Sequence, residues 1–374
     1  MSSTTLTDQA VGIGRLPLVG AARSGTLRAA AIVVALLSLT LAPMVVVNTA
    51  AIETTRAGLT DLAVANLRTR SVATAAAIDA YLQARRRDII NVSQFPDVIA
   101  YAQNLGNEGQ RDLARAALAG AATATPAYES IAVLNLDGLI MAASIQTDEG
   151  TSVRFRDYFQ NARAGSVFVS DPSYSVITNK PALFFSAPVK TTDGVLVGVV
   201  RSRVNLTPIW DLVESDLASI GAGAHSFLID DYGIRLAVSE TKGNRDKAES
   251  LIYQPIAPID RDTAVRLAAD KRFGQLTAEQ LRVDPLPELK TVVDGISRTG
   301  PTAFVFQGHG AQERGVATRL ESKPWVYVVA MAPATYTGVL NGASNSVAIG
   351  AALGAIAAML VAAWLLRTRR TGAE

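Results

Sequence analysis

Two long apolar runs near the two ends of the chain constrain what it can fold into. The first run covers Ala29–Ile52 and the second covers Val347–Leu366. Each is close to the roughly 20 residues that a helix needs to cross the hydrocarbon core of a bilayer. We therefore expect transmembrane helices at residues 29–52 and 344–366, with the larger part of the 374-residue chain between them.

Basic residues set the expected orientation of these two helices. On the sides that face the chain ends lie Arg15, Arg23 and Arg28 before the first run and Arg367, Arg369 and Arg370 after the second. Positive charge beside a span favours the cytoplasmic side, so both termini are expected inside and the middle segment outside. A cleaved signal peptide is the alternative for the first run, but its apolar core normally has only about 7–15 residues. An uncleaved anchor fits better.

The composition excludes several kinds of chemistry. The chain has no cysteine, which rules out disulfides, thiol catalysis and cysteine-bound metals. Two histidines are too few for a histidine-rich metal site, and a net charge of +2 does not indicate a nucleic-acid partner. We expect neither a metal nor a cofactor.

The segment after the first run has a helical pattern. Apolar residues recur at close to 3.6-residue spacing from Glu53 to about Asn104, and the first proline is Pro96. This predicts a long stalk helix that continues from the first span. The cluster Arg85-Arg86-Arg87 within it fits either an anion site or a solvated face, and on a long helix the solvated face is more common.

Strand patterns dominate the rest of the middle segment, and their order occurs twice. Residues 130–144 read as a hairpin that turns at Asp137-Gly138, and residues 226–239 repeat its apolar runs around an Asp and a Gly. Further strands are predicted at residues 167–170, 182–190 and 195–205 in the first copy, and at 303–307, 314–321 and 325–332 in the second. Helices are predicted at 109–124, 155–164 and 208–220. The order indicates an internal duplication and an α+β fold built on antiparallel sheets.

Two stretches resemble a known family. Phe155–Leu206 (FRDYFQNARAG to GVVRSRVNL) and Lys323–Pro333 (KPWVYVVAMAP) are similar to the bacterial double Cache extracytoplasmic sensor domains. The resemblance implies a long membrane-emergent helix and two PAS-like antiparallel-sheet modules, as found in chemoreceptors, sensor histidine kinases and diguanylate cyclases. The expected divisions are a cytoplasmic tail (1–28), a first span (29–52), a stalk helix (53–104), a distal module (105–220), a membrane-proximal module (221–343), a second span (344–366) and a cytoplasmic tail (367–374).

The resemblance also gives positions for a ligand site in the distal module. One subgroup of the family binds amino acids through an Arg-x-Trp-Tyr element, a Tyr-x-Asp element and a late Asp. Here the corresponding positions hold Arg156, Tyr158 and Phe159, then Ser173 and Ser175, then Arg203. Because both family carboxylates are missing, the resemblance argues against an α-amino acid as the ligand.

The alternation of one strand points to an anion instead. In the strand around residues 199–205, Arg201 and Arg203 share one face, and Val200 and Val204 share the other. If the apolar face packs on the stalk helix, the arginines face the pocket together with Arg156, and forked guanidinium donors suit a carboxylate. Aromatic walls are expected from Tyr158, Phe159 and Tyr174. The alternative is a solvated sheet face on which the arginines pair with acids such as Asp157 or Asp171.

Two other motifs give weaker evidence about function. Ser239-Glu240-Thr241-Lys242 has the Ser-x-x-Lys spacing of penicillin-recognising enzymes, but the accompanying motifs are absent, so we expect no catalytic site and no enzymatic activity. Gly350 and Gly354 form a Gly-x-x-x-Gly pair in the second apolar run, which suggests a homodimer face in the membrane.

The sequence thus predicts a bacterial inner-membrane sensor for a small extracytoplasmic ligand, most simply a carboxylate or another small anion. Its signal would pass across the bilayer to a separate or missing effector, because only eight residues, 367–374, follow the second span. The alternative is a ligand-binding accessory subunit or scaffold of a transporter or envelope complex.

Overall fold

The computed structural model describes residues 20–215, 220, 223–239, 252–296, 300–308 and 311–368. The predicted N-terminal tail up to residue 19, the Ser-x-x-Lys motif beyond Ser239 and the tail from residue 369 lie outside these ranges. The chain divides into two units, Met1–Leu59 with Thr337–Glu374, and Thr60–Tyr336.

The first unit consists of two apolar helices. Helix α1 (Gly20–Ser93) contributes its N-terminal part, and helix α10 (Pro333–Thr368) contributes most of its length. Both are long and apolar enough to cross a membrane, judged by length and composition. Pro43 lies inside α1, and the helix continues through it. Both predicted spans are therefore helical.

In the second unit, α1 has one buried stripe. Leu67, Ala75, Ile78, Leu82 and Ile89 are almost completely buried, at spacings of three, four, seven and eight residues. A helix with this periodicity places its apolar stripe against a neighbouring layer and its polar residues towards solvent.

The helix predicted over residues 53–104 is divided at its C-terminal end. Helix α1 ends at Ser93 and α2 (Pro96–Gln103) begins at the proline. The residue before a proline is disfavoured in the helical region, and Phe95 accordingly has an extended backbone with ψ of 130°. Helix α3 (Glu108–Thr123) follows, capped by the Asn107 side chain, which accepts a hydrogen bond from the Gln110 amide.

The first sheet has six antiparallel strands. Their order is β2-β1-β6-β5-β3, and β4 pairs with β5. The strands are β1 (Tyr128–Leu134), β2 (Ile140–Ala143), β3 (Phe168–Val169), β4 (Ser173–Tyr174), β5 (Pro181–Lys190) and β6 (Leu196–Val204). The short helices η1 (Gln146–Asp148) and α4 (Asp157–Arg163) lie between β2 and β3 in the chain, and α5 (Thr207–Ser215) follows β6.

The second sheet repeats this topology with five strands in the order β8-β7-β11-β10-β9. They are β7 (Ala224–Ile229), β8 (Arg235–Val238), β9 (Thr302–Gln307), β10 (Gln312–Arg319) and β11 (Val326–Met331). Helices α8 (Arg261–Ala269), η2 (Ala278–Gln280) and α9 (Pro287–Gly295) lie between β8 and β9 in the chain. The predicted α+β fold with two antiparallel sheets is confirmed.

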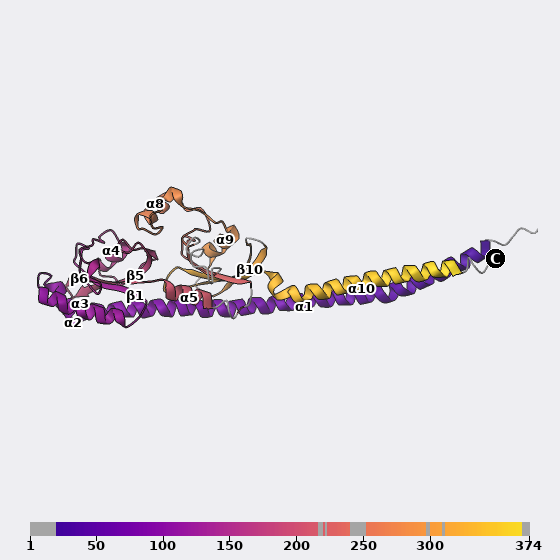
Figure 1. Ribbon diagram of the computed structural model, residues 1–374, viewed down its shortest axis with the longest axis horizontal. Helices are drawn as coiled ribbons and strands as arrows, with labels where there is room; N and C mark the ends of the chain where they lie inside the picture. Colours follow the sequence, from indigo (N-terminus) through magenta and orange to yellow (C-terminus); the bar gives the residue numbers. More distant parts are fainter. Residues whose placement is uncertain are drawn as a thin grey trace, which may run out of the picture. The chain divides into compact units, whose positions relative to one another are not determined.

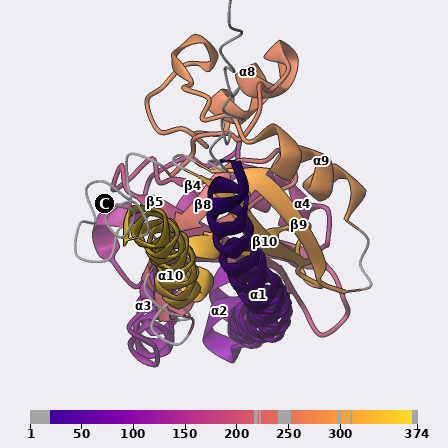
Figure 2. The same ribbon diagram turned by 90° about the vertical axis from the view of Figure 1, so that its right-hand side faces the viewer.

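Both sheets pack one face on α1. The shared hydrophobic core joins α1 residues such as Ile78 and Leu82 to Val200 of the first sheet and Val329 of the second. Helices α4, α8 and α9 lie on the opposite side of the sheets (Figures 1 and 2). We call the α1-facing side the inner face of each sheet and the other side the outer face.

The two hairpins that begin the sheets are built alike. Oδ1 of Asn135 accepts hydrogen bonds from the amides of residues 137 and 139, and Oδ1 of Asp230 accepts from residues 232 and 234. Gly138 and Gly233 follow three residues after these side chains with φ of 83° and 77°, a conformation that favours glycine. This shared turn supports the internal duplication.

Candidate ligand site on the outer face of the distal sheet

Strand β6 turns two arginines to the outer face of the first sheet. Arg201 and Arg203 are almost completely buried, while Val200 and Val204 join the core on α1. The predicted alternation therefore holds along this strand. The alternative of a solvated face does not, because both arginines are enclosed.

A carboxylate that the sequence did not single out lies between the two arginines. Asp148 Oδ2 is 3.2 Å from Arg201 Nη2 and 3.0 Å from Arg203 Nη1, and it accepts a hydrogen bond of 2.6 Å from the Ser130 hydroxyl. Burial disfavours the ionised form, but Ser130 and the two arginines outweigh burial and lower the pKa of Asp148. Arg203 also pairs with Glu129 at 2.9 Å. The arginines thus pair with Asp148 and Glu129, and not with Asp157 or Asp171.

Arg156 approaches the same outer face from the start of α4. Its guanidinium lies 5.8 Å from the centre of the Phe184 ring, and that of Arg201 lies 6.0 Å from the same ring. Tyr158 stacks on Phe184 with ring centres 4.7 Å apart. The Nε atoms of Arg156 and Arg201 are buried and have no hydrogen-bond partner among the described residues. Two buried guanidinium groups, each with an unpaired Nε donor among the described residues, therefore flank one aromatic ring.

The other predicted site residues, Phe159, Ser173, Tyr174 and Ser175, have different surroundings. Phe159 is buried in the hydrophobic cluster of the outer face. The Ser173 hydroxyl is 3.3 Å from Arg156 Nη1, whereas the Ser175 hydroxyl accepts hydrogen bonds from the amides of the following turn. The ring of Tyr174 lies 5.5 Å from Tyr253 and packs against a hydrophobic cluster of the second module.

The backbone around Tyr174 ties the first module to the loop after α8. Arg156 donates to the carbonyl oxygens of Tyr174 and Asp270, both at 2.5 Å, and the Tyr174 amide donates to the Lys271 carbonyl at 2.8 Å. Arg156 therefore belongs both to the candidate site and to the contact between the two modules.

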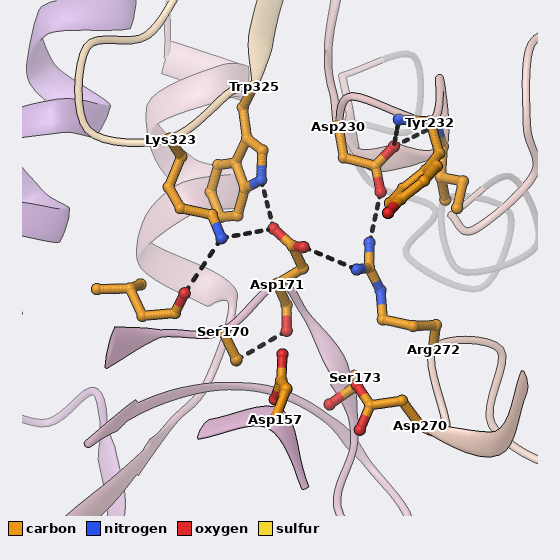
Figure 3. A network of polar contacts seen from close by, with 12 residues as sticks. Asp157, Ser170, Asp171, Ser173, Asp230, Tyr232, Asp270, Arg272, Lys323 and Trp325 are labelled. Carbon is orange, nitrogen blue, oxygen red and sulfur yellow. Dashed lines mark hydrogen bonds and ion pairs between the residues drawn. The ribbon is translucent and has the colours of Figure 1, made fainter. Parts of the chain in front are cut away.

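A second buried network extends this contact, with Asp171 at its centre and Arg272 linking it to Asp230 (Figure 3). The Arg272 guanidinium pairs with Asp171 of the first module at 2.9 Å and with Asp230 of the second at 2.5 Å. Lys323 and the Trp325 indole donate to the other oxygen of Asp171, at 2.9 Å and 2.7 Å. Burial disfavours the Asp171 anion, but Arg272 and Lys323 prevail and hold its pKa at about 2. We call Asp171, Asp230, Arg272, Lys323 and Trp325 the inter-module network.

The pKa values of neighbouring carboxyl groups are raised, in contrast to that of Asp171. Burial, reinforced by Asp157, raises the pKa of Asp270 to about 7, although Arg156 is 3.6 Å away. Burial also raises the pKa of Asp157 and brings that of Asp230 to about 7. Oδ1 of Asp230 accepts the turn hydrogen bonds of the proximal hairpin. The tertiary structure adds a second role for this side chain, the ion pair between its Oδ2 and Arg272.

The predicted glycine pair lies in the first unit. A Cβ added at Gly354 would come within 2.9 Å of the Leu41 side chain on α1 of the same chain. In the described part of the chain, nothing lies within 4 Å of a Cβ added at Gly350. Gly354 therefore allows close packing of α10 on α1, and the predicted dimer face remains a prediction.

The described residues contain no group of three or more metal-ligating side chains. The outer face of the distal sheet offers arginine donors and an aromatic floor, with Asp148, Glu129 and Asp270 as the carboxyl partners of the arginines. This set of groups can bind a small molecule that carries a hydrogen-bond acceptor or a negative charge.

Comparison with known proteins identifies the architecture. Residues 55–339 match the family model of the Cache domain, dCache_1. No curated protein sequence matches the chain significantly. Among solved structures, the sensor domain of the V. cholerae histidine kinase DctB matches with a TM-score of 0.57 at 12% identity, over 70% of this chain and 94% of that one.

The ligand-binding domain of the Campylobacter jejuni chemoreceptor Tlp3 is also similar. In complex with L-valine it matches with a TM-score of 0.52 at 11% identity, over 77% of this chain and 98% of that chain. The isoleucine-bound sensory domain of the same receptor gives the same TM-score and identity. At these identities the structural matches show the fold alone.

Proposed function

Because this chain belongs to the double Cache family of extracytoplasmic sensor domains, we propose that it senses a small carboxylate and transmits its binding across a membrane. Membership of a sensory, ligand-binding family supports a small-ligand sensor. The choice of a carboxylate rests on one observation. Arg156 and Arg201 flank Phe184, and within the described part of the chain the buried Nε donor of each has no hydrogen-bond partner.

The electrostatics of the site favour an anion despite Asp148. That carboxylate already accepts from Ser130 and pairs with both strand arginines. Glu129 pairs with Arg203 and leaves Arg156 and Arg201 with unused donors. A ligand carboxylate would satisfy these donors, and forked guanidinium groups match its geometry. An ammonium group would add a further cation beside three arginines.

The membrane part of the proposal rests on the first unit. Apolar side chains on both of its helices are largely exposed, among them Leu39 at 71%, Val47 at 67% and Leu360 at 65%. Lipid could cover these surfaces without burying any unpaired polar group, because the backbone of a helix forms its hydrogen bonds internally. We place the sensor unit on the periplasmic or extracellular side of a bacterial inner membrane and both termini in the cytoplasm. We further propose that two copies associate and act on a separate effector.

The test is a ligand screen of the full chain in lipid nanodiscs. Carboxylates, amines and amino acids are compared by thermal unfolding, and a ligand at 100 times its Kd adds about 2.7 kcal/mol of stability. We expect carboxylates to raise Tm and amines of the same carbon skeleton to leave it unchanged.

Two variants locate the binding. Arg156→Lys and Arg201→Lys keep the charge but lose the forked donor, so we expect each to reduce the carboxylate-dependent shift strongly. Arg163→Ala, at an exposed position of α4, is the matched control and should retain the full shift. A full response in both lysine variants, or stabilisation by amines alone, would contradict the proposal.

A further inference from the structure

The arginine triplet of α1 is divided between two environments. The Arg86 and Arg87 side chains are exposed, whereas that of Arg85 is only 15% exposed. Arg85 lies at a cavity of about 330 Å³ on the inner face of the distal sheet, between α1, the end of α3 and strands β1 and β6. This cavity is on the opposite side of the sheet from the arginine cluster.

Two buried polar groups of the cavity can donate hydrogen bonds to a ligand. Ser202 lines the cavity from β6, is completely buried, and its hydroxyl has no hydrogen-bond partner in the part of the chain that the structure describes. The same holds, within the described residues, for Nε of Arg85. Asp88 also lines the cavity, but its Oδ2 accepts from the Tyr128 hydroxyl at 2.7 Å and pairs with Arg85 Nη1 at 3.2 Å.

Aromatic rings hold the arginine in place. The Arg85 guanidinium lies 5.6 Å from the ring centre of Tyr81 and 5.2 Å from that of Tyr128. Burial raises the pKa of Tyr81 to about 12, so this ring stays neutral and does not provide a counter-anion. A fixed cation with an open donor is preorganised for a ligand and loses little entropy on binding.

The rest of the wall contains the polar side chains Asn91 and Thr125 and is otherwise apolar, with Ile89, Val92, Phe95, Ala121, Ala124 and Ile131. A volume of 330 Å³ lies at the lower end of the range for small-molecule pockets. It suits a compact aliphatic body with one polar head.

We propose that this inner cavity is a second ligand site that binds a short-chain aliphatic carboxylate, whose head group contacts Arg85 Nε and the Ser202 hydroxyl. Ser202 lies between Arg201 and Arg203 on β6, so one strand carries a donor to each face of the sheet. Occupancy of the inner site therefore acts on the strand that forms the outer site and on α1 at the same time.

The absence of cysteine from the chain makes a direct test possible. Ser202→Cys introduces one thiol into the cavity of the full chain in nanodiscs. Its rate of modification is measured with an anionic methanethiosulfonate, which forms a mixed disulfide and releases sulfinate. Thr69→Cys, at an exposed position of α1, shows the rate for an open site.

The charge at position 85 is then removed in the Ser202→Cys background. We expect Arg85→Gln to slow the anionic reagent about tenfold, equivalent to about 1.4 kcal/mol, and Arg86→Gln to change the rate less than about twofold. Isovalerate should protect the thiol, and isoamylamine, its amine counterpart, should not. Equal rates in the two glutamine variants, no protection by isovalerate, or no modification of this thiol while the Thr69→Cys thiol reacts would overturn the proposal.

A second measurement does not depend on the cysteine. In an Arg201→Lys background, which weakens the outer site, isovalerate should still raise Tm, and adding Arg85→Gln but not Arg86→Gln should abolish that rise. Loss of the rise with Arg201→Lys alone would assign isovalerate to the outer site and refute the inner one.

Discussion

The outer faces of the two sheets share one topology and differ in what fills them. In the distal sheet, strand β6 presents Arg201 and Arg203 to the outer face, with Asp148 between them. In the proximal sheet, the equivalent strand β11 presents Val326, Val328 and Ala330, which pack into an apolar cluster with residues of α9. Apolar side chains dominate the proximal face, where Arg235 on β8 is paired with Asp284 at 2.7 Å. The distal face carries more charges, which must be paired or bound to a ligand. This difference is what the proposed function requires, with recognition in the distal module and a mainly apolar core in the proximal one.

The largest effect is expected where the two modules meet. Arg272→Ala would leave Asp230 completely buried without its cation and Asp171 with Lys323 as its remaining basic partner. Removing one member of a buried ion pair costs about 3–5 kcal/mol. Urea unfolding of the full chain measures the loss. Arg266→Ala, at an exposed position of α8, is the control, and a loss of less than about 1 kcal/mol for Arg272→Ala would show that the network does not hold the modules together.

The next prediction separates the two outer faces directly. Val328→Ala on β11 removes two buried methyl groups and should lower the free energy of unfolding by about 2 kcal/mol. It should leave the carboxylate-dependent rise in Tm unchanged. Arg201→Lys should do the reverse, with a small change in stability and a strongly reduced rise in Tm for carboxylates that bind the outer site. A ligand response that depends on Val328 would mean that the proximal face also contributes to recognition.

The pH dependence tests the carboxyl groups at the contact between the modules. The pKa of Asp270 is raised to about 7 by burial and by Asp157, so its proton is held more tightly in the folded than in the unfolded chain. Stability from this group is complete below about pH 4 and falls as the pH rises to about 7, by at most about 1.4 kcal/mol per pH unit. The lowered pKa of Asp171 affects stability only below about pH 4. There its contribution to the stability of the folded chain decreases as the pH falls, because protonation removes its ion pairs.

We therefore expect a smaller difference in unfolding free energy between pH 5 and pH 7 for Asp270→Asn than for the unmodified chain. Asp262→Asn, at an exposed position of α8, should keep the original pH dependence. The same pH dependence in both variants would remove Asp270 from this explanation.

The smallest effect concerns the paired hairpins. Asn135→Asp gives the distal hairpin the residue of the proximal one, and its Oδ1 can still accept both turn hydrogen bonds. We expect a change in the free energy of unfolding below about 0.5 kcal/mol. The reverse change, Asp230→Asn, removes the partner of Arg272 and should cost more. Equal costs in urea unfolding would argue that the shared turn, and not the ion pair, dominates at both sites.

Local patterns explain how much of this protein could be predicted from its sequence. The period of α1, the hairpin at Asp137-Gly138 and the alternation of β6 depend on neighbouring residues. These predictions identified an element or its inward face, although the break of the stalk helix before Pro96 and the short strand β4 were missed. The repeated strand order was sufficient to predict the duplicated α+β fold.

The partners of the charged residues depended on tertiary structure alone. Asp148 lies 53 residues from Arg201, and Asp270 lies 114 residues from Arg156, so no spacing in the sequence connects them. The same is true of Arg85 and Ser202, which meet at one cavity only because α1 packs on β6. The sequence by itself determined which side chains share a face, because that follows from the period of a helix or strand. The tertiary structure decided which charges pair and which donors stay open, because that depends on elements brought together by burial of the core.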